Sequence, residues 1–98
     1  MSKITLIVNA TLNPDESEAL AYYSKHAGAI LKAYGGTLIG KYTVFKTITE
    51  KKLETVVIVM EFEDDTIIEV LNSGAEYKKL IPYRDKAFTQ ISINFANS

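Results

Sequence analysis

The residues with the clearest potential for chemistry lie in the segment 73–85, SGAEYKKLIPYRD, where a second helix is expected to end. This segment carries the phenols of Tyr77 and Tyr83 and the guanidinium of Arg84. The planar fork of an arginine can hold a carboxylate in two parallel hydrogen bonds. We therefore expect Tyr77 and Arg84 to turn toward a sheet, with Pro82 redirecting the chain between them, and to contribute to a pocket for an organic ligand.

Two partners are open to Arg84. The first is a protein acid in a structural ion pair, either Glu61 in its otherwise apolar run or a local acid such as Glu76, because a buried guanidinium without a counter-charge is costly. The second is a carboxylate of a bound ligand. If Glu61 faces a cleft instead of Arg84, it becomes a candidate general base.

The first predicted helix carries a second group of polar aromatic residues. His26 follows Tyr22 by four residues, so the two side chains share one face of the helix. They form either a proton-transfer pair or a half-exposed histidine with a local hydrogen bond. The catalytic candidates are His26 and Glu61. The expected ligand-binding residues are Tyr22, Tyr23, His26, Tyr77 and Arg84.

The composition excludes several classes of function. The chain has 98 residues, 47% of them hydrophobic, which fits a single domain over 1–98. Its formal charge of −1 is spread without a basic run, so we expect neither nucleic acid nor a membrane surface as a partner. With no cysteine and one histidine, we expect no metal site and no cofactor. We interpret the protein as cytoplasmic, because its apolar runs are too short for a membrane span and no signal-peptide pattern precedes them.

Periodicity and turn residues predict six elements. Strands are expected over 4–10, 37–48, 53–62 and 89–95, with a hairpin loop over 49–52. A helix should begin at Asn13-Pro14 and end at Gly35-Gly36, with an apolar stripe comprising Leu20, Tyr23, Ala27, Ile30, Leu31 and Tyr34. A second helix should follow Asp64-Asp65-Thr66, break at Ser73-Gly74 and resume for a turn before Pro82.

The order βαββαβ predicts an α+β ferredoxin-like fold, with a four-stranded antiparallel sheet and both helices on one face. The other face needs a cover. The third strand has Val57 and Val59 on one side and Val56, Ile58 and Met60 on the other, so neither side is polar. We expect a homodimer that packs sheet against sheet.

The chain also resembles a known family. Gly35-Gly36 after an aromatic-ended helix, the strand end Met60-Glu61-Phe62, and the run from Ser73 through Tyr77 to Arg84 are similar to domain-of-unknown-function family 1330, in the dimeric α/β-barrel superfamily. The resemblance covers nearly the whole chain. It implies a ferredoxin-like protomer, a dimer joined through its sheets, and a cleft between sheet and helices.

Two classes of function stay open. The first is a small cofactor-free enzyme, for which the resemblance implies oxygenation or isomerisation of an organic substrate. The second is a binding or stress-associated dimer without turnover. In both, the cleft is expected to take a small aromatic or carboxylate-bearing molecule, with apolar walls for affinity and a few polar groups for orientation.

Overall fold

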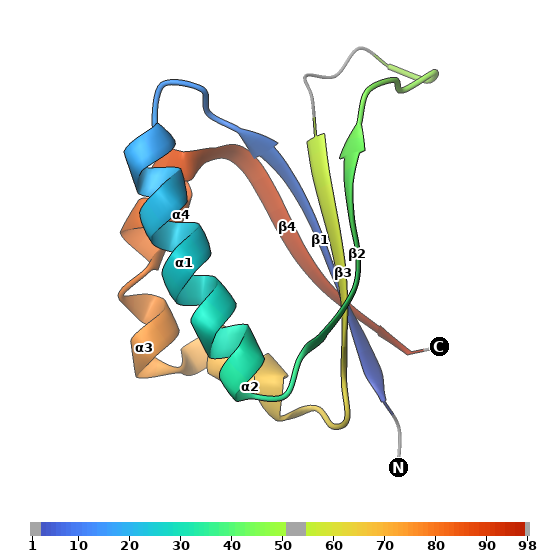
Figure 1. Cartoon of the computed structure of the whole chain (residues 1–98), viewed down its shortest axis with the longest axis vertical. Coiled ribbons are helices and arrows are strands. Elements are labelled where there is room, and N and C mark those ends of the chain that lie inside the picture. The colour runs from blue at the N-terminus through green and yellow to red at the C-terminus, as the bar shows by residue number, and fades with distance from the viewer. Residues whose placement is uncertain (1–2, 51–54, 98) are drawn as a thin grey trace.

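The computed structural model describes residues 3–50 and 55–97. The elements are β1 Ile4–Leu12, α1 Ser17–Ala33, β2 Thr37–Val44, β3 Thr55–Phe62, α2 Thr66–Ser73, α3 Ala75–Lys78, α4 Ile81–Ala87 and β4 Phe88–Asn97. This order and the single sheet confirm the predicted ferredoxin-like fold (Figure 1). Residues 51–54 of the predicted hairpin loop and third strand lie outside the described residues.

The sheet is antiparallel throughout, in the order β2-β3-β1-β4. Leu6 on β1 lies opposite Met60 on β3 and Phe95 on β4, which sets the register of the three strands. Because side chains alternate between faces, these residues share one face, and all the helices cover it (Figure 1). The strands predicted over 4–10 and 53–62 therefore correspond to β1 and β3.

The first helix begins later than predicted. α1 starts at Ser17, because Asn13 forms a turn instead of a helix cap. Its side-chain oxygen accepts from the Asp15 N–H at 3.1 Å, and its own N–H donates to the Ala87 carbonyl at 2.8 Å. These bonds tie the chain entering α1 to the end of α4.

The end of α1 agrees with the prediction. Gly35 has a φ of +83°, in the left-handed region that favours glycine. Gly36 passes so close to the sheet that a Cβ there would lie 2.8 Å from side-chain atoms of Met60 and Phe62. The paired glycines thus both stop the helix and allow the chain to approach β3. Tyr34, predicted to belong to the buried stripe, is 50% exposed at this end.

The second predicted helix is divided into α2, α3 and α4. Gly74 separates α2 from α3, and a Cβ at this position would collide with the Val70 carbonyl oxygen. Pro82 lies in the first turn of α4, where a missing N–H costs no hydrogen bond. Pro82 therefore stands in the first turn of the helix that carries Arg84.

The core consists of two apolar clusters on the helix side of the sheet. One joins the sheet to α2 through buried Ile4, Leu6, Met60, Phe62 and Ile67. The other joins α1 to α3 and α4 through Tyr23, Ala27, Ile30, Tyr77 and Leu80. The first cluster packs α2 on the sheet, and the second packs the helices on each other. Between α1 and the sheet a cavity remains.

The outer face of the sheet, away from the helices, differs from one edge to the other. The register places Tyr42, Val57, Asn9 and Ser92 in one row across it, and Val59, Ile7 and Asn94 in the next. The face is therefore apolar over β2 and β3 and polar over β4. Among the described residues, no helix is long and apolar enough to cross a membrane.

Candidate functional site: a cleft between helix α1 and the sheet

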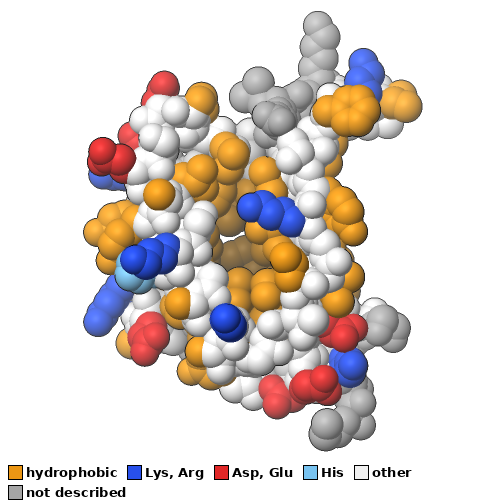
Figure 2. Space-filling view, in the orientation of Figure 1, with side chains coloured by type: hydrophobic (Ala, Val, Ile, Leu, Met, Phe, Trp, Pro, Cys, Tyr) orange, Lys and Arg blue, Asp and Glu red, His pale blue; other side chains and the backbone are white. Residues whose placement is uncertain are grey.

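A cleft of about 310 Å³ separates α1 from the sheet. Figure 2 shows it as a hollow with apolar side chains along its walls. β1 contributes Val8 and Leu12, α1 contributes Leu20 and Leu31, and β3 contributes Val56 and Ile58, all of them half-buried. Such walls favour an apolar ligand, because burying their exposed surface would stabilise the complex by roughly 25 cal/mol per Å².

Three of the cleft-lining residues are polar: Tyr23, Ser24 and Lys41. Lys41 lies opposite Ile58 in the β2–β3 register, so its side chain leaves the sheet on the helix side. Within residues 3–50 and 55–97, no acidic side chain forms an ion pair with it. Lys41 thus supplies a cation at a cleft whose walls are apolar. The sequence analysis missed it, although a lysine between Gly40 and Tyr42 in a predicted strand was a usable signal.

Tyr23, Tyr77 and Arg84 come together, as expected for a shared site. The hydroxyls of Tyr23 and Tyr77 are 2.7 Å apart, and Arg84 Nη1 donates to the Tyr77 hydroxyl at 3.3 Å. The guanidinium carbon also lies 5.8 Å from the centre of the Tyr77 ring, within cation–π range. α1, α3 and α4 each contribute one member of this hydrogen-bonded chain.

Burial shapes the electrostatics of the chain. Loss of solvation raises the pKa of Tyr23, and the hydrogen bond with Tyr77 raises it further. Burial lowers the pKa of Arg84, but the bond to Tyr77 and the charge of Asp85 outweigh this, so the net shift is upward. Near neutral pH Tyr23 is therefore a neutral phenol and Arg84 is a cation.

The predicted pairing of Arg84 with Glu61 is wrong. Arg84 Nε is buried without a hydrogen-bond partner and lies 3.5 Å from a carboxylate oxygen of Asp85. Glu61 leaves the sheet on the outer face and forms an ion pair with Lys3 at 3.4 Å. The interaction with Lys3 raises the pKa of that lysine. Because the whole sheet separates Glu61 from the helices, it reaches neither Arg84 nor the cleft.

Tyr22 and His26 lie apart from the cleft, in a shallow groove of about 440 Å³ between α1 and α3. Their ring centres are 4.2 Å apart, and Tyr83 stacks on Tyr22 at 4.1 Å. Glu76 and Lys79 border the same groove. The five predicted binding residues therefore divide between two places. Tyr23 lines the cleft with Tyr77 and Arg84 behind it, and Tyr22 and His26 lie on the helix surface.

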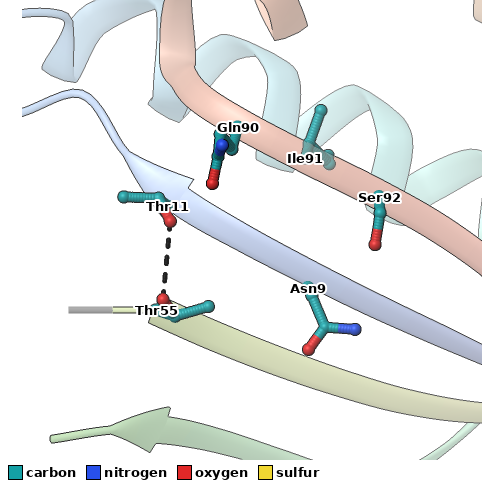
Figure 3. Close-up of a pocket in the computed structure, with 6 residues that line it drawn as sticks. All are labelled: Asn9, Thr11, Thr55, Gln90, Ile91 and Ser92. Atoms are coloured by element: carbon teal, nitrogen blue, oxygen red, sulfur yellow. Dashed lines mark hydrogen bonds between the residues drawn. The ribbon is translucent and has the colours of Figure 1, made fainter. Parts of the chain in front are cut away.

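A third concavity, of about 400 Å³, lies on the polar part of the outer sheet face. Figure 3 shows its side chains on β1, β3 and β4, with Thr11 and Thr55 joined by a hydrogen bond of 3.4 Å. Asn9, Gln90 and Ser92 complete its polar lining. Over the described ranges, no group of three or more His, Cys, Asp or Glu side chains is placed to hold a metal ion.

The family comparison identifies the chain. It belongs to the family described as Domain of unknown function (DUF1330), whose sequence model matches residues 6–95. No curated protein matches the chain.

Several solved structures share its fold. A protein of unknown function from Rhodopseudomonas palustris is 17% identical, with a TM-score of 0.79 over 99% of this chain and 82% of that one. A NIPSNAP domain protein from Burkholderia xenovorans is 16% identical, with a TM-score of 0.63 over 95% and 91% of the two chains. A Bacteroides thetaiotaomicron protein described as a possible oxidoreductase is 13% identical, with a TM-score of 0.63 over 99% and 98%. At these identities the likeness concerns the fold alone.

Proposed function

We propose that this DUF1330 member binds a small organic anion with an apolar body, held in the cleft between α1 and the sheet with its charge beside Lys41. The observation that carries the proposal is the combination of a 310 Å³ apolar cleft with a cation that no described carboxylate neutralises. A charge-assisted contact to Lys41 would orient the ligand, while the apolar walls would supply most of its affinity.

The proposal moves the charged contact from Arg84 to Lys41. Arg84 already donates to Tyr77 and faces Asp85, whereas Lys41 borders the cleft itself. Of the five residues predicted to bind a ligand, Tyr23 has a direct place in this cleft, and Tyr77 and Arg84 support it from behind. Tyr22 and His26 would contact only a ligand bound in the groove between α1 and α3, which we call the outer groove.

Two aromatic probes that differ in charge test the proposal. We expect 2-naphthoate to bind the purified protein, and Lys41→Met to weaken it by about fivefold to tenfold through loss of the charge-assisted contact. The neutral 2-acetylnaphthalene should bind wild type and Lys41→Met equally. Lys41→Arg keeps the charge, and Lys25→Met removes an exposed lysine of α1 outside the cleft, so both should bind naphthoate as wild type does. Calorimetric titration that detects binding of neither probe to the folded protein would overturn the proposal.

We also propose that two protomers associate through the outer face of the sheet. Ile7, Val57 and Val59 form a half-buried apolar surface there, and Tyr42 beside them is 56% exposed. A two-fold axis would place this surface against its own copy. Light scattering should give the mass of a dimer for wild type and a lower mass for Val59→Asp. The control Ile68→Asp, at an exposed apolar position on α2, should stay dimeric, and a wild-type protein that is monomeric at micromolar concentration would refute the dimer.

Turnover of the bound molecule is a second candidate function. It is favoured by the buried phenol pair at the cleft wall and by the similar fold of a protein described as a possible oxidoreductase. Cofactor-free oxygenation would consume molecular oxygen together with the organic substrate, and isomerisation would conserve mass. Liquid chromatography with mass detection of a cleft ligand after incubation with the protein separates both from simple binding: oxygenation adds mass only when oxygen is present, and isomerisation changes the retention time at unchanged mass. We further propose that the protein is located in the cytoplasm, as interpreted from the sequence.

A further inference from the structure

We infer that Arg84 and Tyr77 orient the Tyr23 hydroxyl so that it donates a hydrogen bond into the cleft, and that the cleft ligand therefore carries an oxygen acceptor on its apolar body. This inference rests on the proposed function and adds a second polar contact to it. Lys41 would recognise charge from β2, and Tyr23 would recognise a carbonyl, carboxylate or phenolate oxygen from α1.

The direction of the hydrogen-bonded chain follows from its donors. A guanidinium has no acceptor, so Arg84 Nη1 donates and the Tyr77 oxygen accepts. Between Tyr77 and Tyr23 either hydroxyl has the geometry to donate. If Tyr23 donated, the Tyr77 proton would be left over at a side chain that is only 2% exposed, and no second acceptor for it is present among the described residues.

The opposite direction moves the free proton to the less buried of the two phenols. When Tyr77 donates to Tyr23, the one free proton belongs to Tyr23, which is 9% exposed and lines the cleft. Leaving a buried donor unpaired costs about 1–3 kcal/mol, so this arrangement is favoured. Arg84 thus acts at a distance, by fixing which way Tyr77 donates.

The surroundings of Tyr23 leave the cleft as the place for that proton. Its ring packs edge-on against Tyr77 and Phe88, with ring centres 6.2 and 5.5 Å away. Its other neighbours in the core cluster include Ala27, Ile30 and Leu80, whose side chains accept no hydrogen bond. A ligand oxygen in the cleft would satisfy a donor that the described part of the protein leaves without an acceptor.

Infrared spectroscopy of bound 2-acetylnaphthalene, labelled with ¹³C at the carbonyl, tests the inference. In wild type the carbonyl band should lie at lower wavenumber than in hexane, because the carbonyl accepts a hydrogen bond. Tyr23→Phe keeps the ring and removes the donor, so the band should return to the hexane position and affinity should fall by about fivefold. The adjacent control Tyr22→Phe, on the outer groove, should leave the band and the affinity unchanged.

Arg84 and Tyr77 are positioning residues in this account. Arg84→Met and Tyr77→Phe should broaden the band and move it part of the way toward the hexane position, because the Tyr23 hydroxyl loses its fixed orientation. If Tyr23→Phe does not fold, the lowered band should persist in Lys41→Met and in Ser24→Ala, because Lys41 and Ser24 carry the other polar side chains of the cleft. A ketone that binds with a free carbonyl in wild type, or that fails to bind while 2-naphthoate binds, would overturn this inference and leave the proposed cleft intact, whereas binding of neither probe removes both.

Discussion

Tyr22 and Tyr23 are neighbours on α1, yet they belong to two regions with opposite properties. Tyr23 is 9% exposed and joins the buried chain of Tyr77 and Arg84 behind the cleft. Tyr22 is 42% exposed and stacks with His26 and Tyr83 in the outer groove. Successive side chains on a helix differ by about 100° in direction, so a single step along the chain separates a core phenol from a surface phenol. Residue type alone therefore does not identify a binding residue here.

The largest contrast between the two regions should appear on truncation. Tyr77→Ala removes a side chain that is 2% exposed, and we expect it to lower the free energy of unfolding by about 3–5 kcal/mol. Tyr83→Ala, in the outer groove at 38% exposure, should cost less than about 1 kcal/mol. Urea denaturation measures both. Similar losses for the two variants would contradict the division into a buried and a surface region.

Arg84→Met should have the next largest effect. It removes a donor to Tyr77 and leaves a buried hydroxyl with one bond fewer, at a cost of about 1–3 kcal/mol. The side chain is 24% exposed and its ion pair with Asp85 is partly solvated, so the pair itself contributes little. We expect Asp85→Asn to be close to neutral in the same denaturation experiment. A large loss in Asp85→Asn would place the role of Arg84 in the ion pair.

The burial of Tyr23 should lower the stability of the protein at high pH. Burial raises the pKa of Tyr23 above the ordinary tyrosine value of 10.0, so above that pH the unfolded chain loses a proton that the folded protein keeps. Stability that is fully present below pH 10 is then lost as the pH rises, by up to about 1.4 kcal/mol per pH unit for one group. Tyr23→Phe should flatten the decline of unfolding free energy above pH 10. Parallel pH profiles for wild type and Tyr23→Phe would show that Tyr23 ionises freely in the folded state.

The smallest effect is expected in the outer groove. His26→Gln removes one ring from an exposed stack and should change the free energy of unfolding by about 0.5 kcal/mol or less. It should also leave binding of 2-naphthoate in the cleft unchanged, because His26 does not line that cleft. Loss of naphthoate binding in His26→Gln would move the candidate site from the cleft to the groove.

Parts of the fold and of the site were accessible from the sequence. The alternation in 89–95 predicted β4, since a period-two pattern depends only on neighbouring residues. The short, β-branched apolar runs of 4–10 and 53–62 predicted β1 and β3. Tyr77 and Arg84 also meet, on α3 and α4, because only seven residues separate them along the chain. The start of α1 was wrong because Asn13 is held by the Ala87 carbonyl, a contact across 74 residues that no local pattern contains.

The order of the elements follows from the sequence alone, because it depends on local patterns of apolar residues and on the glycines that end α1. Which polar side chains meet depends on tertiary packing. The register of β2 on β3 places Lys41 at the cleft, and the face of β3 that carries Glu61 keeps it away from Arg84. The packing of α1 on α3 and α4 brings Tyr23 to Tyr77 across 54 residues. Contacts of this kind depend on the distances between helices and strands. The pattern of residue types along the chain indicates which face of an element a side chain lies on, but it does not determine those distances.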